Sequence, residues 1–396
     1  MWLVPLLFFT YQFVLRLWPS LTMQQVMTQF SVDASSYGLF VSCYYYGYSG
    51  MQIPIAVALD KYGPRLILTL CALLCCIGMY ISINGDTWGL VLFGRFIIGV
   101  GSAGGWLSTS KVISQRFASK HYTRVVGFSF SIGLVGLVYG GRPTSELVQA
   151  IGWKPVGNIL SIVALGIAVM AFLILRNKKS DDVVAEKLKI KDIINIIKSP
   201  KLIALAIANL LMVGSLEGLS DVWGVNYLVA GYGMEKSSAA QIISFIAIGM
   251  IFGGPILAFF SQYIGEYIMI FIAGLVMALC IILLLYSPMP LNDFMLSSIC
   301  FVIGIMCCYQ LLVFSIGSKI SSKQTLSLTI AFLNCINMLG GAFFHTLIGI
   351  GMDSFSQNTA LSGIYSVDSY QIALLIIPIC AIVGGVIALL LWRKQN

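Results

Sequence analysis

Long apolar runs recur along the whole chain, and they restrict it to a fold that crosses a membrane. Spanning helices need about 20 apolar residues each. Only 10% of the 396 residues are charged and 59% are hydrophobic, whereas a soluble domain has about 25% charged residues. We therefore predict an all-α membrane protein with twelve transmembrane helices, at residues 2–27, 35–58, 66–84, 89–112, 124–147, 155–176, 202–229, 239–260, 267–287, 294–317, 325–351 and 370–392.

The basic residues lie mainly in alternate short loops, as the topology of a multi-pass protein requires. The net charge of +8 could indicate nucleic acid as a partner, but this distribution along the loops argues against it. The positive-inside rule predicts that both termini are cytoplasmic, in the inner (plasma) membrane of a cell. The loops predicted to be cytoplasmic contain Lys61, Arg65, Arg116, Lys120, Arg124, Lys319, Lys323, Arg393 and Lys394.

One long polar stretch, at residues 177–201, divides the apolar segments six and six. We predict an N-terminal six-helix bundle at 1–176 and a C-terminal six-helix bundle at 202–396. The polar stretch between them is a cytoplasmic linker, and its KLKIKDIINII portion has the apolar spacing of a short amphipathic helix on the membrane surface. The alternative is a solvated linker without a helix.

The two halves are weakly similar, which suggests an internal repeat. Residues 51–65 align with 252–267 at an offset of 201, and a slip of one residue brings Gly63 onto Gly265. Parallel repeats related by an axis along the membrane normal occur in transporters, which place the substrate site at the interface between the repeats.

The sequence LDKYGPR at 59–65 resembles the signature loop of the major facilitator superfamily. Asp60, Lys61, Gly63 and Arg65 match that motif. This chain has alanine at the usual leading glycine and proline at the first of the paired basic residues. The resemblance implies two pseudo-symmetric six-helix halves, and it implies that the loop locks the cytoplasmic side in the outward-facing state.

The sequence GRFIIGVGSAGG at 94–105 is similar to the fourth-helix motif of the same family, and Arg95 is its arginine. The fifth-helix motif of proton-driven drug exporters is not matched, because 133–143 has Arg142 before Pro143 in the wrong order. Within the superfamily the chain resembles bacterial organic-anion and sugar-acid symporters. It is more distantly similar to the lysosomal dipeptide-transporter branch.

Polar residues in the first predicted helix form one stripe, because Gln12, Arg16, Ser20 and Gln24 recur every four residues. Charged side chains inside a membrane usually face a cavity or a partner. Adding the offset of 201 to Arg16 gives Glu217, so we predict that these two residues face each other across the cavity. The alternative is a permanent structural salt bridge.

We expect Arg16 to bind a substrate carboxylate, because a guanidinium suits bidentate binding of this group. Glu217 and Asp221 are four residues apart and should repel each other, so we predict that they carry the proton. Interhelical hydrogen bonds that only hold the bundle together are the alternative for the polar residues without charge. The further candidates for substrate binding are Gln12, Tyr45, Gln52, Tyr309, Gln310, Asn334 and Asn337, and the predicted gating residues are Asp60, Lys61, Gly63, Arg65 and Arg95.

These features predict a secondary active transporter that works by alternating access and imports a small carboxylate-bearing solute together with a proton. A transporter of zwitterions such as amino acids or dipeptides is the main alternative, followed by an exporter and a transporter-like sensor. The ten cysteines lie in apolar segments without the spacing of metal ligands. We expect no metal, no cofactor, no enzymatic activity and a monomer in the lipid bilayer.

Overall fold

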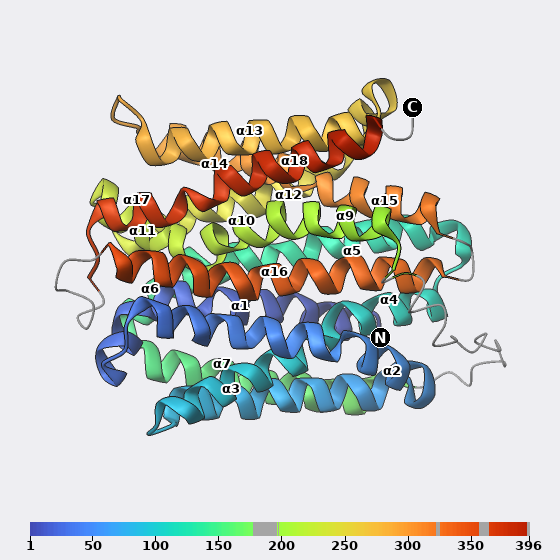
Figure 1. Ribbon diagram of the computed structural model, residues 1–396. Coiled ribbons are helices and arrows are strands. Elements are labelled where there is room, and N and C mark those ends of the chain that lie inside the picture. The colour runs from blue at the N-terminus through green and yellow to red at the C-terminus, as the bar shows by residue number, and fades with distance from the viewer. Residues whose placement is uncertain (177–195, 197, 322–324, 356–363, 394–396) are drawn as a thin grey trace.

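The structure of the chain is a computed structural model, and it describes residues 1–176, 196, 198–321, 325–355 and 364–393. Within these ranges the chain forms a bundle of long helices whose axes run between two ends (Figure 1). These ranges contain no strand. The predicted all-α class is confirmed. The amphipathic helix predicted for the linker lies almost wholly outside the described residues.

The first half of the chain forms helices that run along the bundle. In two places one helix follows another directly, α4 after α3 and α6 after α5. The helices are α1 (Leu3–Phe30), α2 (Ala34–Asn84), α3 (Trp88–Ser102), α4 (Gly104–Arg116), α5 (Ser119–Gly140), α6 (Arg142–Ile151) and α7 (Trp153–Ile174).

The second half begins with a helix that contains two π-helical turns, η1 and η2. Its later crossings resemble those of the first half. The elements are α9 (Pro200–Asn209), η1 (Leu210–Gly214), α10 (Ser215–Gly218), η2 (Leu219–Trp223), α11 (Gly224–Tyr232), α12 (Lys236–Ile264), α13 (Glu266–Tyr286), α14 (Asp293–Cys307), α15 (Tyr309–Ile320), α16 (Leu326–Ser354), α17 (Val367–Leu374) and α18 (Ile376–Arg393).

Short polar side chains start several of these helices. The first turn of a helix has backbone N–H groups without partners in the helix, and a side-chain oxygen just before it can accept from one of them. Asp33 does so for α2, Thr87 for α3, Ser199 for α9 and Asn292 for α14. The polar residues between the apolar runs therefore fix where the helices begin.

Two glycines turn the chain at equivalent places in the two halves. Gly63 interrupts the 51-residue α2 with φ 80° and ψ 167°, and Gly265 separates α12 from α13 with φ 88° and ψ 150°. Residues with a side chain rarely adopt this conformation. The sequence repeat aligned these same two glycines, and their shared backbone conformation supports it.

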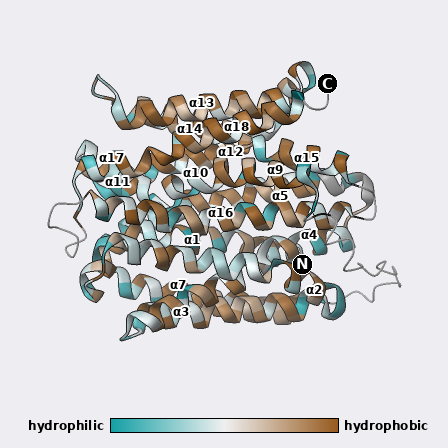
Figure 2. Cartoon of the chain, in the orientation of Figure 1, coloured by the Kyte–Doolittle hydropathy of each residue, from teal (hydrophilic) through white to brown (hydrophobic). Residues whose placement is uncertain are grey.

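The helices of the described residues have the length and composition of membrane spans. Ten of them are long and apolar enough to cross a membrane. One of the ten is α2, which contains two predicted segments on either side of Gly63, and the 28-residue α1 coincides with the first predicted segment. Every predicted segment thus coincides with a helix, and the number of spans stays a prediction. Hydrophobic colour covers most of α13 and α18 in Figure 2.

The bundle has two ends that carry different residues. We call the end with Asp60, Lys111 and Lys319 the linker end, because α7 ends there and α9 begins there; it is on the right in Figure 1. The opposite end, with Asp33 and Asp353, is the far end.

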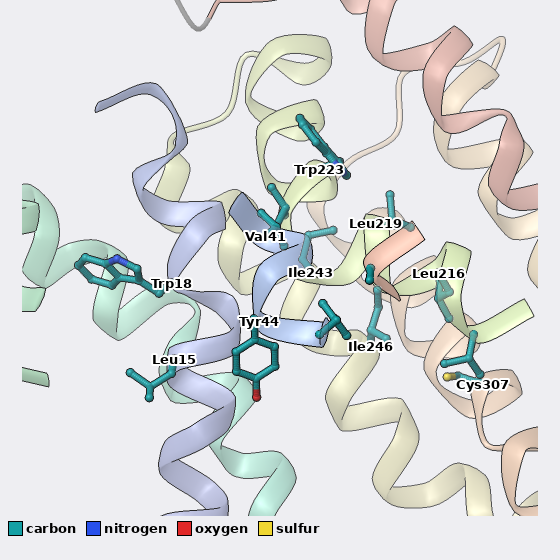
Figure 3. Close-up of a cluster of buried hydrophobic side chains, with 14 of the residues drawn as sticks. Leu15, Trp18, Val41, Tyr44, Leu216, Leu219, Trp223, Ile243, Ile246 and Cys307 are labelled. Carbon is teal, nitrogen blue, oxygen red and sulfur yellow. The ribbon is translucent and has the colours of Figure 1, made fainter. Parts of the chain in front are cut away.

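The two halves pack against each other through α2 with α16, α5 and α6 with α12, and α1 with η2. A cluster of buried apolar side chains continues from one half into the other (Figure 3). Leu15 and Trp18 of α1 belong to it, as do Leu216 of α10 and Ile243 of α12. The space between the halves is therefore lined by buried apolar groups, and a charge there needs a partner.

Candidate functional site

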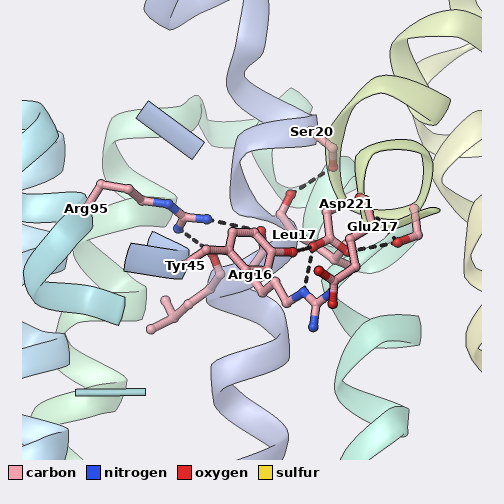
Figure 4. A network of polar contacts seen from close by, with 9 residues as sticks. Arg16, Leu17, Ser20, Tyr45, Arg95, Glu217 and Asp221 are labelled. Carbon is pink, nitrogen blue, oxygen red and sulfur yellow. Dashed lines mark hydrogen bonds and ion pairs between the residues drawn. The ribbon is translucent and has the colours of Figure 1, made fainter. Parts of the chain in front are cut away.

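Three charged side chains meet in the middle of the bundle, where α1 faces the π-containing helix of the second half (Figure 4). The Arg16 guanidinium lies 2.8 Å from Glu217 Oε1 through Nη2 and 2.5 Å from Asp221 Oδ2 through Nε. Both carboxylates are almost fully buried, with 7% and 2% of their side chains exposed. The predicted pairing of Arg16 with Glu217 is confirmed, and Asp221 joins it.

The two carboxylates have unequal surroundings. Asp221 accepts hydrogen bonds from Arg16, from the Tyr45 hydroxyl and, at 3.0 Å, from the Ser220 hydroxyl. Glu217 accepts from Arg16 through Oε1, while its buried Oε2 has no partner among the described residues. Asp221 therefore has three side-chain donors, whereas Glu217 has one.

The cluster has an unbalanced charge. One guanidinium faces two carboxylates, so the three groups sum to one net negative charge when both acids are ionised. Excess charge in a buried site is costly unless it is neutralised or solvated. The arrangement therefore suits the uptake of one proton or one cationic group.

Arg95 holds the backbone of α1 beside the cluster. Its Nη1 donates to the Leu15 carbonyl at 2.7 Å and its Nη2 donates to the Arg16 carbonyl at 3.2 Å. In an uninterrupted helix the Leu15 carbonyl would accept from residue 19, but Pro19 has no N–H to donate. Arg95, which is 1% exposed, supplies the missing donor. Its guanidinium also lies 4.8 Å from the ring centre of Tyr44.

The absence of a side chain at Gly341 lets α16 approach the cluster. A Cβ at this position would overlap Glu217 Oε2 and lie about 2.5 Å from Cε1 of Tyr45. One residue earlier, Gly340 packs against the backbone of Gly214 in η1. Gly340 and Gly341 therefore let α16 contact both the charged cluster and the π-containing helix to which Glu217 belongs.

A cavity of about 580 Å³ opens beside the cluster. This is within the range of small-molecule sites. Its wall contains Arg16, Glu217 and Asp221 and four further predicted residues, Gln12, Gln52, Gln310 and Asn334. The predicted residues Tyr45, Tyr309 and Asn337 are fully buried behind the wall. Tyr45 reaches the cluster through Asp221, and a role in substrate binding for all of these residues stays a prediction.

The cavity has an aromatic side that the polar pattern did not indicate. Phe9 and Phe13 of α1, Trp106 of α4 and Phe130 of α5 line it together. Their signal in the sequence was present but weak, because Phe9 and Phe13 fall on the same helical face as Gln12 and Arg16. Tyr44, Tyr48 and Ser220 line the cavity too.

Three contacts of the LDKYGPR loop lie within the first half. Asp60 pairs with Lys111 of α4 at 2.6 Å, and Arg65 Nε donates to the Phe172 carbonyl of α7 at 2.7 Å. Lys61 lies over the ring of Tyr62 at 5.0 Å. Lys319 and Glu266 form a similar ion pair, at 2.8 Å, within the second half. The described ion pairs of the linker end thus join helices of one half.

At the far end, by contrast, hydrogen bonds join the two halves. The Asp353 carboxylate at the end of α16 accepts from the backbone N–H groups of Ala34 at 3.1 Å and Ser35 at 2.7 Å, at the start of α2. The Tyr365 hydroxyl donates to Asp353 at 2.7 Å. Burial opposes ionisation of the neighbouring Asp33, but hydrogen bonds donated by Ser36 and Ser35 outweigh it and hold the pKa of Asp33 below its usual value.

Other contacts between the halves lie toward this end. Lys236 Nζ of α12 donates to the Leu21 carbonyl of α1 at 3.0 Å. Arg142 Nη1 of α6 donates to Gln241 Oε1 of α12 at 2.5 Å. The first half and the second half are therefore held together at the far end by charged side chains from both.

A bundle of apolar helices that encloses a charged cavity defines a multi-pass membrane transporter. Residues 1–345 match the profile of the Major Facilitator Superfamily, and the chain belongs to that family. The curated relatives and solved structures described below are named as transporters.

Among curated proteins, the chain is 22% identical over 141 residues to the "Probable sulfoacetate transporter SauU" of Cupriavidus necator, a match that covers 36% of this chain and 33% of the relative. It is 23% identical over 167 residues to the "Probable L-galactonate transporter" of Escherichia coli, covering 40% of this chain and 35% of the relative. The matched segments thus span about a third of these curated relatives.

Solved structures match the fold over almost the whole chain. A bacterial homologue of the human lysosomal transporter Spinster, in an inward-facing and occupied conformation, has a TM-score of 0.78 at 16% identity, covering 99% of this chain and 96% of that chain. The nucleoside transporter NupG has a TM-score of 0.76 at 13% identity, covering 99% of each chain. At these identities the likeness establishes the fold alone.

Proposed function

We propose that the chain imports an organic acid together with a proton, by alternating access, across the inner (plasma) membrane. The observation that carries this proposal is the cluster of Arg16, Glu217 and Asp221 in the wall of the cavity. The similarity to proteins named as sulfoacetate and galactonate transporters supports an organic anion as the substrate. In alternating access, the two predicted six-helix halves move relative to each other.

The orientation of the proposal follows from the basic loops. By the positive-inside rule the linker end is cytoplasmic, and so are both termini. The cross-half hydrogen bonds of Asp353, Lys236 and Arg142 hold the far end, which is then the external side. The linker-end ion pairs lie within single halves. Together these contacts support an inward-facing state.

The proposed coupling uses the unequal carboxylates. Glu217, with one oxygen unpartnered, takes up the proton, and its contact with Arg16 Nη2 is then weakened. The substrate carboxylate binds the guanidinium in its place. Asp221 keeps the hydrogen bonds that Arg16, Tyr45 and Ser220 donate to it. Substrate binding and proton binding therefore favour each other, as symport requires.

The net negative charge of the cluster favours one second candidate. An amino group could neutralise the charge in place of the proton, which would make the substrate a zwitterion such as an amino acid or a dipeptide. Transport of such a solute would not require protonation of Glu217, and its dependence on a pH gradient would be weaker than that of an organic acid.

Glu217→Gln separates proton coupling from transport itself. Glutamine keeps an oxygen that can accept from Arg16 but cannot release a proton, so we expect accumulation driven by a pH gradient to disappear while substrate exchange in equilibrated vesicles persists. Uptake into proteoliposomes, with a panel of organic acids, amino acids and dipeptides, measures both. Glu146→Gln is the matched control, because Glu146 is exposed and pairs with Arg142 within α6.

Full gradient-driven accumulation by Glu217→Gln would overturn the proton role. The combined variant Arg16→Glu with Glu217→Arg tests the structural alternative, since it can preserve a salt bridge at the site. We expect it to lose transport, because the guanidinium is then on the wrong helix to receive the substrate. Full transport by this variant would mean that Arg16 only stabilises the helix bundle and does not contact the substrate.

A further inference from the structure

The aromatic side of the cavity forms a compartment beside Arg16. Phe9 lies with its ring centre 5.2 Å from that of Phe13 and 5.0 Å from that of Trp106. Trp106 meets Phe130 edge to face at 5.7 Å. Three helices therefore contribute rings to a single wall, and all four rings border the cavity.

Packing of these rings against each other leaves part of their surface uncovered. Phe13, Trp106 and Phe130 are only half-buried, although they lie inside the bundle. Across the cavity the second half presents apolar side chains, among them Met250 of α12 and Phe314 of α15. The compartment thus has apolar groups on both sides, and its ring faces and edges remain available to a ligand.

The spacing along α1 relates this compartment to the charged cluster. Phe13 precedes Arg16 by three residues and Phe9 precedes it by seven, on the same face of the helix. At 1.5 Å per residue, the backbone positions that carry these rings lie about 4.5 and about 10.5 Å along the helix axis from that of Arg16. A molecule whose carboxylate and ring are separated by two or three bonds covers this interval.

We infer that the transported acid carries an aromatic or similarly large apolar group, which occupies the compartment of Phe9, Phe13, Trp106 and Phe130 while its carboxylate binds Arg16. The inference rests on the proposed function, which supplies the role of Arg16, and it narrows the substrate class. A hydroxyl group buried against these rings would lose its hydrogen bonds to water without replacement. Polyhydroxylated acids should therefore bind less well than aryl acids of the same charge.

Gly127 offers a way to fill the compartment without disturbing the fold. It lies in α5 one turn before Phe130 and borders the cavity, and a Cβ there would meet no atom within 4 Å. Gly127→Leu should occupy the space intended for the apolar group. Gly166 of α7 is the matched control, because it too has no atom within 4 Å of a Cβ and it lies outside the cavity wall.

The experiment compares acids that share a carboxylate and differ in the rest of the molecule. Apparent dissociation constants of propionate, 3-phenylpropionate and galactonate are measured by thermal-shift titration of the purified full chain. We expect 3-phenylpropionate to bind at least about tenfold more tightly than either other acid, as the burial of one ring implies. The preference should persist in Gly166→Leu and fall to about twofold or less in Gly127→Leu and Phe130→Ala.

Equal affinities for the three acids, or an unchanged preference in Gly127→Leu, would overturn the inference. Arg16→Gln distinguishes this failure from failure of the proposed function. If Arg16→Gln weakens all three acids while no preference exists, only the aromatic compartment is wrong. If the preference holds and Arg16→Gln has no effect, the carboxylate is recognised elsewhere and the proposed role of Arg16 is wrong. Binding by none of the acids contradicts both.

Discussion

Arg95 illustrates how a buried arginine can act through the backbone. It donates to the carbonyl that Pro19 leaves without a helical partner, and in doing so it fixes the turn of α1 that carries Arg16. Arg95→Met should leave the Leu15 carbonyl unsatisfied, at a cost of about 1 to 3 kcal/mol in the free energy of unfolding. The apparent affinity for carboxylates should fall too, because Arg16 loses its support.

A substitution at Pro19 tests whether Arg95 acts through the Leu15 carbonyl. Pro19→Ala restores an N–H at the position that can donate to Leu15, so it should recover part of the stability lost in Arg95→Met. A double-mutant cycle from thermal unfolding measures this coupling. Strictly additive effects of the two substitutions would show that Arg95 stabilises the bundle in some other way.

The pairing of Arg16 with Glu217 was predictable because the sequence repeat puts the two residues at equivalent positions in the two halves. The residue types alone do not indicate that they pair. The offset of 201 connects Arg16 to Glu217, which lie 2.8 Å apart. Tyr45 was a candidate residue from its type and helix, but its hydrogen bond to Asp221 was not predictable, because that bond depends on how α2 packs against the second half. The aromatic compartment was missed because the sequence signal was weak: phenylalanine is common in apolar helices, and only the shared face of Phe9 and Phe13 with Gln12 and Arg16 pointed to the cavity.

At the scale of elements, the close approach of α16 to α10 depends on the absence of a side chain at Gly341. Gly341→Ala should force Glu217 and Tyr45 away from their present positions, because its Cβ would overlap both. We expect a lower unfolding temperature and loss of gradient-driven uptake. Gly166→Ala in α7 is the control, since its Cβ meets open space. Wild-type uptake and stability in Gly341→Ala would show that α16 adjusts without cost.

The helices were largely predictable and their irregularities were not. Apolar length predicts a span in any chain that must satisfy its backbone groups within a membrane. The two π-helical turns on either side of Glu217, the second of which contains Asp221, have no comparable signal, because a π turn is a change in hydrogen-bond register that neighbouring helices stabilise. Gly63 was predicted to lie between two spans, and the backbone there is non-helical and turns the chain, with φ 80° and ψ 167°.

For the whole molecule, Asp353 connects the halves at the far end by accepting from the first N–H groups of α2. A carboxylate at a helix N-terminus is worth about 0.3 to 1 kcal/mol when exposed and up to about 2 kcal/mol when partly buried. Asp353→Asn should therefore raise severalfold the fraction of molecules in which the two halves are separated at the far end. Faster hydrogen exchange at the amides of Ala34 and Ser35 would report it. Asp293→Asn, at the start of α14, is the control, and unchanged exchange in Asp353→Asn would contradict the prediction.

The proposed ratio of one proton to one carboxylate at the Arg16 cluster also determines how the carrier responds to voltage. With one proton and one monocarboxylate bound, the site has the same net charge as when it is empty. A membrane potential does work of about 2.3 kcal/mol per elementary charge per 100 mV, and that work is then equal for the loaded and the empty carrier. Uptake of a monocarboxylate by the proposed mechanism is electroneutral and is driven by the pH difference alone. A dicarboxylate carried with one proton would bring one further negative charge inward, and a potential that is negative inside would oppose its accumulation.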